Sequence, residues 1–139
     1  MAWSHRQTEI DGRPSLVLID DSYRDAAPIN ELPKIAWFGV YFRLDPGPSF
    51  WDPDEDEALH AIEKDLLQLC GQFGNGCAAY VMCIDTRGMR EYYIYYGDGA
   101  ALENVLPNLK AEHPDYRIEF DHTTDSQWKR YTTFLPETP

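Results

Sequence analysis

The chain has 139 residues, which suits one domain with a single hydrophobic core. Apolar residues make up 43% of it and aromatic residues 14%, too many large side chains for a disordered chain. The 24 acidic and 12 basic residues give a formal net charge of −12, and such a field repels phosphate backbones and anionic lipids. Nucleic acid and membranes are therefore disfavoured as partners.

The cysteines and the start of the chain indicate a reducing compartment. Cys70, Cys77 and Cys83 form an odd number without a CxxC pair, which argues against a disulfide framework and a thiolate zinc site. The first ten residues lack the apolar segment of a signal peptide, and no apolar run reaches membrane length. We therefore expect reduced thiols and a cytoplasmic location.

Residues 2–20 predict a β-hairpin, because two β-like runs flank the turn-forming Asp11 and Gly12. Residues 21–33 contain two prolines and charges of both signs, and they predict a long surface loop.

Residues 35–44 predict a strand at the centre of a sheet. Side chains alternate along it, and both faces carry aromatic residues. One face would present Ala36, Phe38, Val40 and Phe42, and the other Trp37, Gly39, Tyr41 and Arg43.

A helix is predicted after this strand, because apolar residues then recur at spacings of three and four. Asp52 is the expected N-cap, Pro53 the first helical residue and Glu55 the capping-box residue. The acidic run 54–57 would lie in solvent at the positive end of the helix dipole, since consecutive positions on one turn do not converge on a metal ion. The helix should end within residues 71–76, where glycines accept left-handed backbone angles.

A second hairpin is predicted over residues 77–97, with Arg87 and Gly88 as its loop. With this loop, the strand residues of the hairpin divide between the two faces of the sheet. The first face would hold Ala79, Val81, Cys83, Tyr92, Ile94 and Tyr96, and the second Tyr80, Met82, Ile84, Glu91, Tyr93 and Tyr95.

The rest of the chain predicts a helix, a strand and a last short helix. The first helix is marked by apolar residues at 102, 105, 106 and 109, with Asp98 as its cap and Pro107 favouring a kink or a short helix. Tyr116, Ile118 and Phe120 alternate as a strand. Residues 125–135 would form the last helix, with Asp125 as its cap and Trp128, Tyr131 and Leu135 on one side.

Together these elements predict a single α+β domain over residues 1–139. Residues 34–122 have the order β-α-β-β-α-β of a ferredoxin-like sandwich, to which an N-terminal hairpin and a C-terminal helix are added. The helix-covered face would take Phe38, Val40, Phe42, Val81, Ile94, Ile118 and Phe120.

The opposite face is the candidate binding surface. Trp37, Tyr41, Glu91, Tyr93 and Tyr95 would meet there, with acidic residues at the rim. One alternative is that the N-terminal hairpin, or the last helix with Trp128 and Tyr131, covers part of the face as a second small core. The other is a surface for a partner protein or a second copy of the chain. RNA binding is disfavoured, because the flanking strands lack a ring of Lys and Arg.

An enzyme is the competing class, and the motifs disfavour it. The four histidines lack metal-ligand spacing, and no nucleophile elbow, phosphate loop or dinucleotide fingerprint is present in the sequence. Asp121, His122 and Asp125 are the nearest approach to a metal site, but residues 121 and 122 of one strand point to opposite faces. We therefore expect no catalytic residue, metal or cofactor.

The chain as a whole resembles the domain-of-unknown-function family 695. The residues that carry the resemblance are Trp3, DGRPSLVLID, DEDEALHAIEKDLL, TRGMREYYIYY and the closing Asp125, Trp128, Tyr131, Leu135 and Pro136. The closing residues also resemble the end of the regulator of RNase E activity B family, which is similar in size and acidity and has a ferredoxin-like fold. These resemblances imply that fold, a bacterial cytoplasmic setting and, from the second family, action by binding another protein.

Two functional hypotheses follow. The first is a non-enzymatic protein-interaction or regulatory domain that uses the aromatic face and its acidic rim. The second is a small-molecule-binding or enzymatic domain with a pocket between the N-terminal hairpin and the sheet, where Tyr41, Tyr93 and Glu91 would be the polar groups. A deep cavity beside Tyr93 would favour the second hypothesis, and a flat exposed patch the first.

Overall fold

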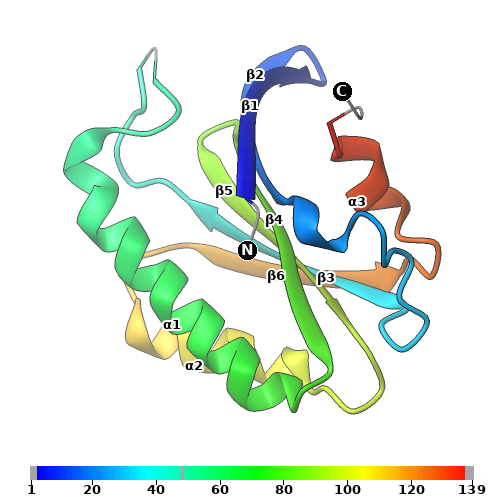
Figure 1. Ribbon diagram of the computed structural model, residues 1–139. Helices are drawn as coiled ribbons and strands as arrows, with labels where there is room; N and C mark the ends of the chain where they lie inside the picture. Colours follow the sequence, from blue (N-terminus) through cyan, green and yellow to red (C-terminus); the bar gives the residue numbers. More distant parts are fainter. Residues whose placement is uncertain (1–2, 48, 137–139) are drawn as a thin grey trace.

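The protein is an α+β structure in which two main helices pack on a six-stranded antiparallel open sheet (Figure 1). This computed structural model describes residues 3–47 and 49–136. The strands are β1 (Trp3–Ile10), β2 (Arg13–Asp20), β3 (Lys34–Tyr41), β4 (Ala78–Thr86), β5 (Met89–Tyr96) and β6 (Ile118–Thr124). The helices are α1 (Asp56–Gly74), α2 (Val105–Glu112) and α3 (Lys129–Phe134). The strand order in the sheet is β1-β2-β4-β5-β3-β6.

Both predicted hairpins are confirmed. Asp11 and Gly12 turn the first hairpin with φ angles of 51° and 78°, and Arg87 and Gly88 turn the second with 55° and 74°. Two successive positive φ angles match the right-handed twist of the strands they join. Strand β2 pairs with β4, so the N-terminal hairpin extends the sheet and does not fold over it.

The main core lies between the sheet and helices α1 and α2, which cover the same face (Figure 1). Phe38, Val40, Ile94 and Ile118 are buried there as predicted, and Tyr92 and Tyr96 join them. Each fully buried apolar side chain of this size stabilises the fold by about 1.5–3 kcal/mol. The predicted division of the β5 tyrosines is therefore correct, because Tyr93 and Tyr95 lie on the other face.

The predicted faces of β4 are wrong at its beginning. Ala79 and Val81 lie on the side opposite α1, and Tyr80 packs against the main core. The cause is a register shift between Tyr80 and Met82, where β4 pairs with β5. One extra residue in a strand reverses the alternation on one side of it. Cys83, beyond the shift, faces the main core as predicted.

The start of α1 contains a second correction. Asp52 caps the turn Pro53–Glu55 by accepting a hydrogen bond from Asp54 N at 2.9 Å. Glu55, however, is only 2% exposed and makes no capping-box bond back to Asp52. Its carboxylate accepts hydrogen bonds from Arg43 N at 2.7 Å, from Leu44 N at 3.1 Å and from the Tyr116 hydroxyl at 2.7 Å. Glu55 therefore fastens α1 to the end of β3 and to the segment before β6.

Helix α2 is short, as Pro107 predicts, but Asp98 is not its cap. The helix follows a turn at Leu102–Asn104, and Asp98 instead forms an ion pair with Lys34 at 3.6 Å. Pro107 lies in the first turn of α2, where the missing N–H would have no partner within the helix.

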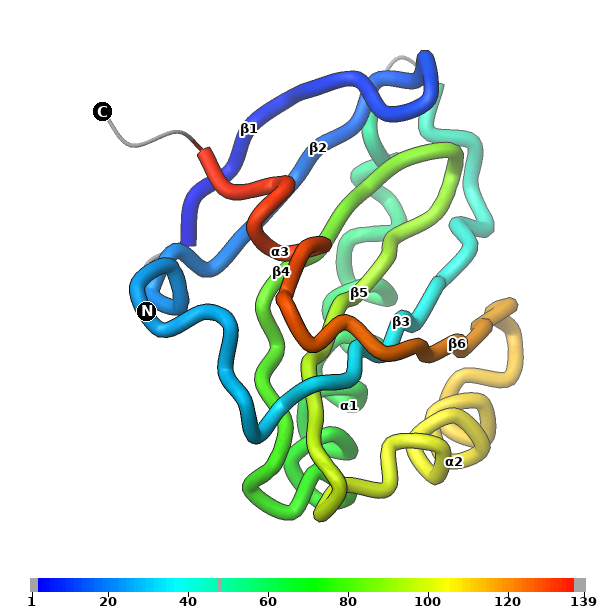
Figure 2. Tube along the Cα trace, turned by 90° about the vertical axis from the view of Figure 1, so that its right-hand side faces the viewer, coloured from blue at the N-terminus to red at the C-terminus, as the bar shows by residue number. Residues whose placement is uncertain are grey.

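The second face of the sheet is covered over part of its area by α3 and by residues 21–33 (Figure 2). Trp128 and Tyr131 are both fully buried there, in a second core with Tyr93 and Tyr95. The Trp128 indole donates a hydrogen bond to Leu32 O at 2.9 Å, which links α3 to the loop. The alternative in which the last helix covers the aromatic face is therefore confirmed for this region.

Candidate functional site: a cleft beside helix α3

Tyr95 belongs to the second core and is not part of an exposed surface. Its side chain is 0% exposed, and its ring stacks on Trp128 with 4.0 Å between centroids and 9° between planes. The Tyr95 hydroxyl donates to Asp125 Oδ2 at 2.6 Å and accepts from Tyr131 N at 3.2 Å. Burial and the bond to the carboxylate raise the Tyr95 pKa, so this hydroxyl stays protonated.

Asp125 fixes the start of α3. Its carboxylate accepts from Lys129 N at 2.9 Å and from Arg130 N at 3.0 Å, the capping bonds that the sequence predicts. The predicted start of the helix at residue 125 is wrong, however, because α3 begins at Lys129 and Trp128 occupies the N-cap position. Burial alone raises the Asp125 pKa, but the bonds from the Tyr95 hydroxyl and from both N–H groups outweigh it and lower the pKa. The carboxylate therefore holds α3 against β5 in its charged form.

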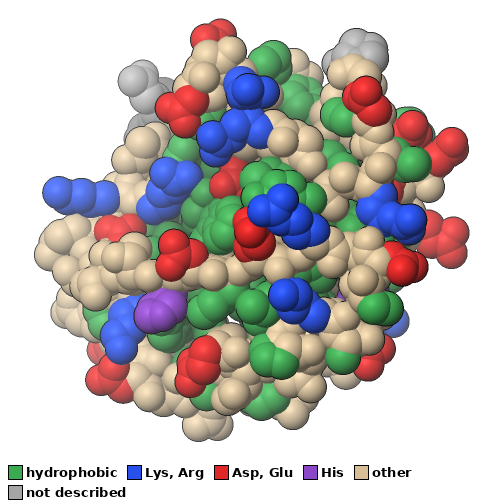
Figure 3. Space-filling view, turned by 180° about the vertical axis from the view of Figure 1, so that it is seen from behind, with side chains coloured by type: hydrophobic (Ala, Val, Ile, Leu, Met, Phe, Trp, Pro, Cys, Tyr) green, Lys and Arg blue, Asp and Glu red, His purple; other side chains and the backbone are tan. Residues whose placement is uncertain are grey.

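Beyond the area that α3 covers, the same face of the sheet carries a cleft of about 480 Å³. Its lining comes from β3, β5, β6, the segment after β6 and α3, namely Ile35, Trp37, Glu91, Tyr93, residues 121–125 and Arg130. Figure 3 views the molecule from the side of β6, where apolar side chains lie among Lys and Arg as well as Asp and Glu. The charged residues that line the cleft are Glu91, Asp121, Asp125 and Arg130, so the cleft is mixed in charge and not uniformly acidic.

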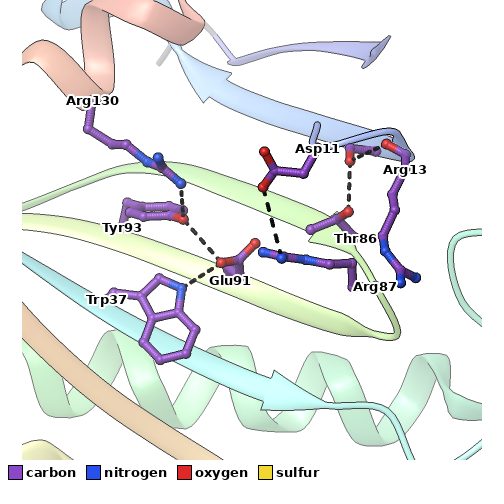
Figure 4. Close-up of polar contacts among 9 residues, drawn as sticks. Asp11, Arg13, Trp37, Thr86, Arg87, Glu91, Tyr93 and Arg130 are labelled. Carbon is purple, nitrogen blue, oxygen red and sulfur yellow. Dashed lines mark hydrogen bonds and ion pairs between the residues drawn. The ribbon is translucent and has the colours of Figure 1, made fainter. Parts of the chain in front are cut away.

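Glu91 and Tyr93 lie side by side in the cleft (Figure 4). They are 6% and 4% exposed, respectively. Glu91 Oε1 accepts from the Trp37 indole at 2.8 Å and from the Tyr93 hydroxyl at 3.2 Å. The Tyr93 hydroxyl in turn accepts from Arg130 at 2.7 Å. Burial, and then the nearby carboxylate, raise the Tyr93 pKa to about 12, so at neutral pH the hydroxyl bridges carboxylate and guanidinium as a neutral group.

Gly39 determines how Trp37 lies. A Cβ atom at Gly39 would be 2.5 Å from two carbons of the six-membered ring of the Trp37 indole. The ring therefore occupies the space that a side chain at position 39 would need, lying along the strand. Trp37 is half-buried in this position, with the rest of its ring at the cleft.

Tyr41 lies on the same face but outside the cleft. Its hydroxyl donates to Glu119 at 2.7 Å, and the Arg117 guanidinium lies 4.3 Å from the centre of its ring. The bond to Glu119 raises the Tyr41 pKa and lowers the Glu119 pKa. Of the five residues predicted for the site, the cleft therefore unites Trp37, Glu91 and Tyr93.

The sequence did not point to Arg130 as a cleft residue. Its guanidinium lies 5.0 Å from the centre of the Tyr93 ring and 5.2 Å from that of Phe134. The available signal was its place in the helix that Asp125 caps, one residue before the predicted core residue Tyr131.

A second cavity, of about 780 Å³, lies at the tip of the N-terminal hairpin. Arg13, Trp51, Thr86 and Arg87 are among its lining residues, whereas Tyr41, Glu91 and Tyr93 are not. Of the polar groups predicted for a pocket between hairpin and sheet, Glu91 and Tyr93 thus lie in the cleft beside α3. Tyr41 lies outside this cleft and is bonded to Glu119.

The described residues offer neither a metal site nor a membrane-spanning helix. Within residues 3–47 and 49–136, no three His, Cys, Asp or Glu side chains are arranged to hold a metal ion. Asp121, His122 and Asp125, the nearest approach to a metal site in the sequence, all line the cleft. The His122 ring stacks on Phe120 with 5.6 Å between centroids. Over the same residues, no helix is long and apolar enough to cross a membrane.

Comparison with known proteins gives one match. The model of the family of unknown function DUF695 matches residues 1–136. No curated protein and no solved structure matches the chain. The resemblance of the C-terminal residues to the regulator of RNase E activity B family is therefore without support.

Proposed function

Since the chain belongs to DUF695, a family of unknown function, we propose from its geometry that it is a non-enzymatic protein-interaction domain. In this proposal a partner protein docks in the cleft between α3 and the edge strand β6. The observation that carries it is Trp37, a half-buried tryptophan held flat at an open cleft beside a buried carboxylate. Aromatic anchors next to polar groups that are already oriented are typical of the energetic centres of protein interfaces.

The cleft is rigid on its strand side, which favours binding. Trp37 is fixed by Gly39 beneath it and by its hydrogen bond to Glu91, and Tyr93 is fixed between Glu91 and Arg130. Side chains that are ordered before binding lose little conformational entropy when a partner arrives. The exposed residues 121–124 of the edge strand β6 continue this surface.

We also infer that β3 to β6 with α1 and α2 form a ferredoxin-like sandwich. The order β4-β5-β3-β6, with both helices on one face, supports this inference. In such a sandwich the face opposite the helices is available for binding, and here α3 takes one part of it and leaves the part that carries Trp37.

Affinity capture with a matched control tests the proposed function. Wild-type protein, Trp37→Ala and Trp51→Ala are each used as bait in native lysate, and a protein recovered by wild type is purified and titrated against all three. Trp51 is also a half-buried tryptophan, but it lies outside the cleft, against Arg90. We expect Trp37→Ala to weaken binding about tenfold or more, because a central aromatic anchor contributes over about 1.4 kcal/mol. We expect Trp51→Ala to bind as wild type does.

Equal binding by the wild type and Trp37→Ala would refute a docking site in this cleft. Circular dichroism of each variant establishes that the fold is retained before the comparison is made.

A further inference from the structure

Among residues 3–47 and 49–136, the Glu91 carboxylate of the cleft has no cationic partner. Glu91 is 6% exposed, and the hydrogen bonds that it accepts from the described residues come from two neutral donors, the Trp37 indole and the Tyr93 hydroxyl, both to Oε1. Within the part of the chain that the structure describes, no Lys, Arg or His forms an ion pair with it. Buried carboxylates are ordinarily paired, because desolvation of the charge is costly.

The second oxygen of this carboxylate is available in the cleft. Oε2 makes no hydrogen bond to the described residues. It is also not one of the described polar atoms that are fully buried without a hydrogen-bond partner, so it is accessible to solvent. Glu91 lines the cleft, and the accessible oxygen therefore borders the space that a ligand would occupy. A donor group placed there would complete the hydrogen bonding of the carboxylate.

The balance of charge in the cleft favours a cation. Three carboxylates, those of Glu91, Asp121 and Asp125, line it against the single guanidinium of Arg130. Asp121 is the cross-strand partner of Trp37 on β6, and Glu91 binds the indole from β5, so the indole lies between two acidic residues. The net charge of −12 also attracts cationic partners over longer range.

The shape of the site favours a planar cation. Trp37 lies along the strand over Gly39, and tryptophan offers the most favourable aromatic face for a cation. The cleft already contains an example of this packing, because the Arg130 guanidinium lies over the Tyr93 ring. A guanidinium can stack on an aromatic ring and donate in its own plane to carboxylates at the same time, which an ammonium cannot do.

We propose that the cleft binds an arginine side chain of a partner protein, which stacks on Trp37 and donates to Glu91 Oε2 and Asp121. This rests on the proposed function and specifies its partner: an exposed arginine in a basic segment. The guanidinium of this arginine would pair with the Glu91 carboxylate, which has no cationic partner among the described residues.

The test uses the Trp37 indole N–H resonance of the whole protein during titration with N-acetyl-arginine N-methylamide. N-acetyl-citrulline N-methylamide is the neutral control of the same shape, and N-acetyl-lysine N-methylamide is the control for charge alone. Glu91→Gln removes the charge and keeps an acceptor for Trp37, while Glu119→Gln removes a charge from the same face outside the cleft.

We expect a saturable shift with the arginine derivative that Glu119→Gln retains. With citrulline, or in Glu91→Gln, binding should weaken at least about tenfold, the scale of one desolvated charge-assisted contact. Lysine should bind more weakly than arginine. Equal binding of citrulline and arginine, an unchanged affinity in Glu91→Gln, or the absence of a saturable shift would each overturn the proposal.

This result is separable from the test of the proposed function. If a captured protein depends on Trp37 but the arginine derivative does not bind, the docking cleft stands and the arginine assignment falls. If capture is independent of Trp37, the docking function itself fails.

Discussion

The role of Glu55 gives the sharpest test of the fold, because two interpretations of this residue predict different contributions to the free energy of unfolding. As an exposed acid in the first turn of a helix, Glu55 would contribute about 0.3–1 kcal/mol through the helix dipole. In the structure it is 2% exposed and accepts three hydrogen bonds, from Arg43 N, Leu44 N and the Tyr116 hydroxyl. Hydrogen bonds to a charged group contribute about 1.5–3 kcal/mol each.

Glu55→Gln therefore separates the two readings. The glutamine oxygen can take the position of Oε2, which accepts from Arg43 N and Tyr116, but its NH₂ group then faces the N–H of Leu44. One bond is lost, the Leu44 N–H and the glutamine NH₂ face each other without an acceptor, and the other two bonds lose their charge, which together cost about 3 kcal/mol. Glu57→Gln is the matched control, since Glu57 is exposed in the same turn and should change stability by less than about 1 kcal/mol.

Urea unfolding followed by far-ultraviolet circular dichroism measures both variants. Tyr116→Phe, which removes one donor, should cost about 1.5 kcal/mol alone and less in the Glu55→Gln background, because the two side chains share one bond. If Glu55→Gln and Glu57→Gln destabilise the protein equally, or if the effect of Tyr116→Phe is the same in both backgrounds, the buried-clamp interpretation is refuted.

Three further outcomes are expected. Trp128→Ala should lower the free energy of unfolding by about 3–5 kcal/mol, measured in urea, because it empties the centre of the second core. The folded-state pKa of Asp125 is lowered, so its carboxylate stabilises the fold above about pH 4 and that contribution is lost as pH falls through the folded pKa. The stability gap between wild type and Asp125→Asn should therefore narrow from about pH 7 to about pH 3, and a constant gap would contradict this. Gly39→Ala should displace Trp37, shift its indole resonance and destabilise by about 1–3 kcal/mol, whereas Gly71→Ala, with nothing within 4 Å of the new Cβ, should stabilise α1 by about 0.5–1 kcal/mol.

The elements were predictable where local chemistry is sufficient to specify them. Asp11-Gly12 and Arg87-Gly88 adopt the positive φ angles that two-residue hairpin turns need, and such residues are visible in a sequence. The register shift at Tyr80 was not predictable, because no glycine or proline marks the extra residue. Ala79, Tyr80 and Val81 consequently came out on the wrong faces.

The candidate site was predictable only in its strand residues. Strict alternation in β3 and β5 brings Trp37, Glu91 and Tyr93 to one face. Alternation along the strands does not predict that α3 covers part of this face and forms one wall of the cleft. Helix α3 reaches the face through contacts between distant parts of the chain, such as the bond from Arg130 to Tyr93, 37 residues away. Glu55 shows the same limit, since its partner Tyr116 is 61 residues away and the capping box was the only reading available locally.

Helix α3 and the cleft share residues, and this determines which substitutions can report on binding alone. Tyr93 contributes to the second core and to the cleft, and its hydroxyl joins Glu91 to Arg130 of α3. A ligand that binds Glu91 therefore acts on α3 through the Tyr93 hydroxyl, so binding of the ligand and docking of α3 should be linked in free energy. Replacing Tyr93 or Tyr95 would confound the two, because either change opens the core. Trp37 lies on β3, which pairs with β5 and β6, and its indole donates to Glu91 and not to α3, so a change at Trp37 is the one that separates recognition from folding.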